Sequence, residues 1–152
     1  MKLQVVEASP EFACGTYGPL AIAVWEAPAT ERSAMSAAQV LRMLGAGRDD
    51  VYMLAVLSTN TPPAGNEVRD IISAAVRDLG AKVRATATVV EGEGFRAAAM
   101  RAALLGMNMI MRRSHPQKSF GTLGEAVSYL SQQSDELREE NLLRAVHQLR
   151  QR

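Results

Sequence analysis

The sequence predicts an α/β fold, in which a mostly parallel sheet of four to five strands is covered by helices in a two-layer or three-layer sandwich. Short apolar runs of strand length alternate along the chain with amphipathic stretches of helix length. Parallel strands need crossover connections of this kind between them. Residues 134–152 carry one more amphipathic pattern, which predicts an appended C-terminal helix.

The first strands are predicted from the N-terminal residues. An apolar stretch over residues 3–6 ends at the turn signal Ser9-Pro10, and residues 12–16 continue or bend this strand. Residues 20–25 are then apolar without interruption. Such a run is typical of a strand that is covered on both faces, so we expect it in the centre of the sheet.

Two strand and helix pairs follow. Thr30 is the predicted N-cap of a helix that Gly45 and Gly47 end, because a threonine hydroxyl can accept a hydrogen bond from a free amide of the first turn. Residues 51–57 form a second apolar run, and an apolar stripe predicts a helix over residues 66–79. Residues 83–90 alternate β-branched with small residues, which favours a strand.

The last third of the chain is predicted to be mainly helical. Residues 95–111 form an almost wholly apolar helix, and residues 119–122 a short edge strand before a helix over residues 123–130. These elements complete an α/β domain over residues 1–133, and residues 134–152 are expected as a separate amphipathic helix.

Composition restricts the function. Seventeen basic and sixteen acidic side chains leave a net charge of +1, which argues against a nucleic-acid partner. No apolar run reaches the roughly 18 residues of a membrane span, so we expect no stable membrane insertion. A single cysteine, Cys14, rules out an internal disulfide and suits the cytoplasm.

No pattern of catalytic residues is visible in the sequence. His115 and His147 lack neighbours at metal-ligand spacing, and nothing near Cys14 in sequence could act as its base. We therefore expect a protein that is not an enzyme and that has no metal site and no cofactor.

The order of elements resembles the STAS-like domain of the anti-sigma-factor antagonists over about residues 2–133. Three local patterns add to it: Tyr17-Gly18-Pro19 before an apolar strand, the turn over residues 91–95, and Phe120-Gly121-Thr122 before a helix. The resemblance implies a regulatory domain that binds other proteins.

In those antagonists a serine at the start of a helix is phosphorylated. The matching loop here, residues 58–66, offers the hydroxyls of Ser58, Thr59 and Thr61 as a phosphorylation switch. It lacks the acidic-serine-serine-glycine pattern of the antagonists. The alternative is a polar loop whose residues serve turn geometry alone.

An interaction surface is predicted on the apolar helix and on the C-terminal helix. A helix that is apolar all round must be covered on more than one side, and methionine suits adaptable contacts. The candidate residues are Met100, Leu104, Met107, Met109, Met111, Leu142, Val146 and Leu149. Cover from within the chain is the alternative.

Two functions remain open. The first is a non-catalytic regulatory module of STAS-like type that binds protein partners and forms a homo-oligomer. The second is a small-molecule or lipid-binding domain with a pocket between the helices and the sheet.

Overall fold

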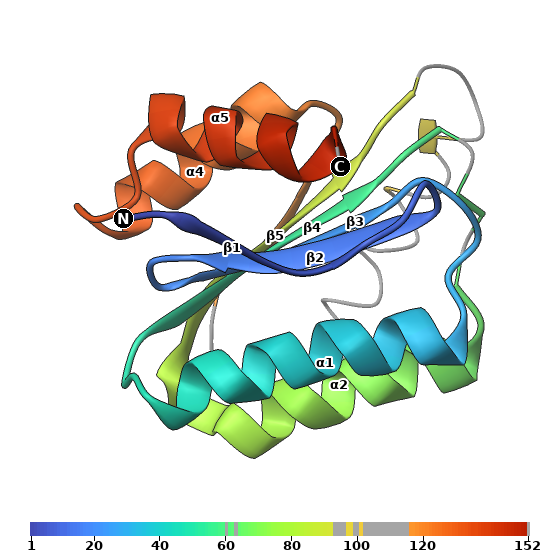
Figure 1. Cartoon of the computed structure of the whole chain (residues 1–152), viewed down its shortest axis with the longest axis horizontal. Coiled ribbons are helices and arrows are strands. Elements are labelled where there is room, and N and C mark those ends of the chain that lie inside the picture. Colours follow the sequence, from blue (N-terminus) through green and yellow to red (C-terminus); the bar gives the residue numbers. More distant parts are fainter. Residues whose placement is uncertain (60, 63, 93–96, 99–100, 102–115, 152) are drawn as a thin grey trace.

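In a computed structural model, the chain folds into three layers: a six-stranded sheet lies between two layers of helices (Figure 1). The structure describes residues 1–59, 61–62, 64–92, 97–98, 101 and 116–151. The strands are β1 (Leu3–Ala8), β2 (Phe12–Tyr17), β3 (Leu20–Trp25), β4 (Val51–Leu57), β5 (Val83–Val90) and β6 (Gln117–Phe120). The helices are α1 (Glu31–Ala46), α2 (Asn66–Leu79), a short 3-10 turn η1 (Gly80–Lys82), α4 (Leu123–Gln133) and α5 (Glu139–Arg150).

The α/β class is confirmed, but the expectation of four to five strands is wrong because the described residues form six. They lie in sequence order across the sheet, β1-β2-β3-β4-β5-β6. The pairs β1–β2 and β2–β3 are antiparallel, and the three pairs from β3 to β6 are parallel. The turns after β1 and β2 are too short for a crossover, so these strands can only pair antiparallel.

One face of the sheet is covered by α1 and α2, which follow β3 and β4 (Figure 1). Alternate strand residues, among them Ala21, Ala23 and Met53, point into a core with the apolar sides of these two helices. The predicted cap of α1 is confirmed: Thr30 Oγ1 accepts from the amide of Ser33, and the Thr30 amide donates to Ser33 Oγ. This is a reciprocal capping arrangement, which satisfies two amides at the start of the helix.

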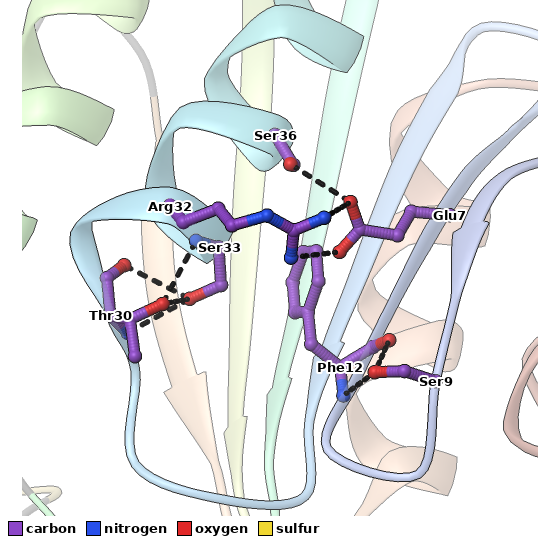
Figure 2. Close-up of polar contacts among 7 residues, drawn as sticks. All are labelled: Glu7, Ser9, Phe12, Thr30, Arg32, Ser33 and Ser36. Atoms are coloured by element: carbon purple, nitrogen blue, oxygen red, sulfur yellow. Dashed lines mark hydrogen bonds and ion pairs between the residues drawn. The ribbon is translucent and has the colours of Figure 1, made fainter.

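Polar contacts attach the edge strand β1 to α1 (Figure 2). The carboxylate of Glu7 accepts hydrogen bonds from Arg32 at 3.3 Å and from the Ser36 hydroxyl at 3.2 Å. In the turn between β1 and β2, the Phe12 amide donates to Ser9 Oγ, and the Ser9 hydroxyl donates to the Phe12 carbonyl. The Glu7 contacts join the N-terminal strand to α1, and the Ser9 contacts close the turn between β1 and β2.

The other face of the sheet is covered by α4 and α5 (Figure 1). Here α5 packs against α4, β1 and β2, in one core with Leu20, Ile22 and Val24 of β3. α5 is therefore part of the second helical layer, whereas the sequence predicts a separate, appended helix over residues 134–152. The helix begins at Glu139 rather than at 134–136, and Leu137 before it is already buried.

Candidate functional site

The carboxyl ends of β3, β4 and β5 lie next to one another, because these three strands are parallel neighbours. Backbone hydrogen bonds continue past the strands. The Ser58 amide donates to the Trp25 carbonyl, and the Glu91 amide donates to the Leu57 carbonyl, both at 2.9 Å. The loop that begins at Ser58 is therefore flanked by the residues that follow β3 and β5. In open α/β sheets this is the edge at which ligands commonly bind.

Two of the three hydroxyls predicted as a phosphorylation switch are buried at this edge. Ser58 is 5% exposed and Thr61 is 3% exposed. Thr61 Oγ1 donates to the Trp25 carbonyl at 2.9 Å, and it lies 3.3 Å from Ser58 Oγ. A kinase could reach these two hydroxyls only after the loop had opened.

Thr59 differs from these neighbours because its side chain is exposed. It lies against Gly92, whose φ is +111°, and a Cβ at Gly92 would lie 2.8 Å from Thr59 Cγ2. Glycine is required here for its backbone conformation and for this close approach. Of the predicted switch residues, only Thr59 is thus accessible to a modifying enzyme or to a partner.

Arg150, in the last turn of α5, binds two carboxylates beside this loop. Its Nε donates to Glu26 Oε1 at 2.8 Å, and its two terminal nitrogens donate to both oxygens of Glu91 at 2.8 and 2.9 Å. The hydrogen bonds with Glu91 raise the pKa of the guanidinium above its usual range. Arg101 lies close by, since its guanidinium donates to the Val90 carbonyl at 3.1 Å, so two cations and two carboxylates leave this part of the edge with no formal net charge among the described residues.

An apolar pocket of about 180 Å³ lies between α2 and the sheet face that α1 and α2 cover. Trp25, at the end of β3, forms part of its wall, and β4 contributes Met53, Ala55 and Leu57. The further described lining residues are Ala29, Ala64, Val68, Arg69, Ile72, Ser73, Val76, Thr86, Ala87, Thr88 and Gln117. Few polar groups in a mostly apolar wall are typical of small-ligand sites.

The predicted interaction surface is not brought together in the described residues. Met100, Leu104, Met107, Met109 and Met111 lie outside them, as does the expected helix over residues 95–111 apart from Ala97, Ala98 and Arg101. Leu142, Val146 and Leu149 are 0% exposed, within the core between α5 and the sheet. These three residues therefore stabilise the fold and form no free surface.

Cys14, the single cysteine, is buried on β2. Burial, together with the nearby Glu7 carboxylate, raises the pKa of its thiol to about 11. At neutral pH it is therefore protonated and a poor nucleophile. Among the described residues, no three His, Cys, Asp or Glu side chains gather in a way that could hold a metal ion.

Comparison of the chain with models of protein families, with curated proteins and with solved structures found no match. In the part of the chain that the structure describes, no helix has the length and apolar character needed to cross a bilayer.

Two features of the site were not found from the sequence. Arg150 is 124 residues from Glu26 and 59 from Glu91, so no local spacing could reveal the ion pairs. The second is the position of the pocket. Its lining comes from β3, β4, α2, β5 and β6, so no single stretch of the sequence indicates where it lies. A pocket between helices and sheet was expected as an alternative, but its lining residues carry no shared motif.

Proposed function

We propose that the chain is a non-catalytic, cytoplasmic regulatory module of STAS-like type, which acts by binding a protein partner and associates with itself. The observation that best supports this proposal is the exposure of Thr59 in the loop from β4 to α2. The resemblance implies a phosphorylated hydroxyl in this loop. Because Ser58 and Thr61 are buried by their contacts with β3, Thr59 is the residue at which the switch would act.

The charges near Thr59 indicate what phosphorylation would do. Thr59 contacts Gly92, the residue after Glu91, and Arg150 already binds both Glu91 and Glu26. A phosphate would add a charge of about −2 to an edge where Arg101 and Arg150 balance Glu26 and Glu91. The modification would therefore make this surface acidic and change its affinity for a charged partner.

The test is a phosphomimetic substitution. With a partner captured from the native cell and then purified, Thr59→Glu is expected to change the Kd by at least about tenfold, because like charges across an interface cost several kcal/mol. Isothermal titration calorimetry measures the affinity, and sedimentation of the full chain measures self-association. Gln39→Glu, on the exposed side of α1, adds one negative charge far from the loop and is the matched control. Equal affinities of wild type, Thr59→Glu and Gln39→Glu would contradict the switch.

The second candidate function is a binding domain for small apolar molecules, and the pocket beneath α2 favours it. A cavity of about 180 Å³ is close in size to engineered apolar cavities of about 150 Å³ that bind benzene. Its volume fits a small molecule or the end of one acyl chain better than a whole lipid.

Native mass spectrometry tests this function. Protein purified from the native cell without denaturant is expected to carry an additional mass, which is lost when the chain is unfolded and refolded. The unfolded and refolded protein serves as the ligand-free reference. A native mass equal to the mass of the bare chain in repeated preparations would count against the second candidate.

A further inference from the structure

β1 forms one edge of the sheet, and among the described residues no strand pairs with its outer side (Figure 1). Every second backbone amide and carbonyl of such an edge strand points away from the sheet, where another strand can bind. Leu3 and Val5 pack against the core that α5 covers, so Gln4 between them points to the opposite face, where it is exposed. Residues 3–5 therefore offer a regular and accessible stretch of edge.

A bulge after Val5 limits this stretch and sets the direction of Glu7. Val5 and Glu7 pair with consecutive residues of β2, so Val6 between them is an extra residue. Without the bulge, Glu7 would lie on the same face as Val5. With it, the Glu7 carboxylate lies on the other face, where α1 binds it (Figure 2). Lys2 precedes the strand and alternates with Leu3, which directs it to the same face as Glu7.

Exposed apolar side chains flank this edge. Val6 in the bulge is 50% exposed, and Met35, one turn from Arg32 in α1, is 61% exposed. Arg32 binds Glu7, so this turn of α1 lies beside β1. Exposed apolar groups beside an unpaired strand favour cover by another chain.

We propose that two copies of the chain associate through their β1 strands, which pair antiparallel about a two-fold axis at Gln4. This inference rests on the self-association in the proposed function and specifies its surface. In this register Leu3 lies opposite Val5 on one face of the sheet, and Lys2 lies opposite Glu7 on the other. Apolar groups thus meet apolar groups and a cation meets a carboxylate, which is the self-complementarity that a two-fold interface requires.

The contacts around Glu7 leave room for the lysine of a second copy. The Glu7 carboxylate accepts from Arg32 and from the Ser36 hydroxyl, and a carboxylate has about four acceptor sites. The Arg32 side chain is 80% exposed, so its ion pair with Glu7 is solvated and weak. Because the regular stretch before the bulge is short, the interface is small, and micromolar rather than nanomolar self-association is expected.

Charged residues at position 4 test the two-fold axis. In Gln4→Lys and in Gln4→Glu like charges meet across the axis, so each variant alone is expected to associate at least about tenfold more weakly than the wild type. An equimolar mixture of the two variants places opposite charges across the axis and is expected to regain association. Sedimentation of the full chain over a range of concentrations measures the dissociation constants.

Gln132→Lys is the matched control. It adds the same charge at an exposed site of α4, a helix that packs over β4, β5 and β6 rather than at the β1 edge. This variant is expected to associate like the wild type. Thermal unfolding followed by circular dichroism shows that each variant is folded.

The outcomes separate this surface from the proposed function. Wild-type association that is unchanged in both Gln4 variants would overturn the β1 interface and leave self-association standing at another surface. A mixture that stays as weak as the separate variants would overturn the two-fold pairing at Gln4. A wild-type chain that stays monomeric at every concentration would overturn both the interface and the self-association, whereas partner binding at Thr59 is decided by its own titration.

Discussion

A chain that ends at Gln133 is expected not to fold, although residues 1–133 were predicted from the sequence to be a complete domain. The truncation removes five side chains from one face of the core, each at most 1% exposed: Leu137, Leu142, Ala145, Val146 and Leu149. Burial of one such large apolar side chain contributes about 1.5–3 kcal/mol. Their loss therefore costs roughly 10 kcal/mol, which is as large as the whole stability of a typical domain.

Urea denaturation followed by circular dichroism measures this effect. The full chain should unfold in one cooperative transition, and the truncated chain should show none. A chain that lacks only residues 151–152 is the control, because Gln151 is exposed and follows the end of α5. A cooperative transition in the chain that ends at Gln133 would show that α5 is a separate unit.

A point substitution distinguishes the core from an interaction surface at the same helix. Leu142→Ala is expected to lower the free energy of unfolding by about 3 kcal/mol, since it leaves a cavity in a fully buried site. The neighbouring Leu143 is partly buried, so Leu143→Ala should cost less. If Leu142→Ala left stability unchanged and altered only self-association, the surface interpretation would be correct.

The second large effect is expected at Gly15, in the middle of β2. A Cβ at this position would lie 2.4 Å from the carbonyl oxygen of Gln4 in β1. The obstacle is backbone, so β1 itself would have to move away from β2. Gly15→Ala should therefore cost about 1–3 kcal/mol, the range typical of overpacking.

Urea denaturation of Gly15→Ala beside Gly47→Ala tests this expectation. Gly47 follows α1 with a φ of −107°, and a Cβ there meets no atom within 4 Å. The control substitution should change stability by no more than about 0.5 kcal/mol. Equal stability of the two variants would contradict the close approach of β1 to β2.

Most elements in the described residues could be predicted from local patterns. The apolar run of β3 and the stripe of α2 have the bounds expected from the sequence, and Thr30 caps α1 as predicted. These features depend on residues close together in the chain, whose periodicity and capping chemistry act locally. The antiparallel start of the sheet differs from the expected mostly parallel sheet, because the turns after β1 and β2 are too short for a crossover connection.

The role of α5 could not be read from its pattern. The line of Leu142, Val146 and Leu149 predicts an amphipathic helix, but an apolar stripe looks the same whether it faces its own sheet or another protein. The structure places it over β1, β2 and α4. The accessibility of Thr59 was likewise not visible, because it depends on the contacts that bury Ser58 and Thr61.

The sequence by itself determined the α/β class, most of the helices and strands, and the polar loop between β4 and α2. Only the tertiary structure decided which hydroxyl of that loop is exposed, that Arg150 binds Glu26 and Glu91, and that α2 and the sheet line a pocket beside Trp25. The physical reason is separation along the chain. Local periodicity sets each element, whereas these contacts join residues from different elements, and only the packing of the layers brings them together.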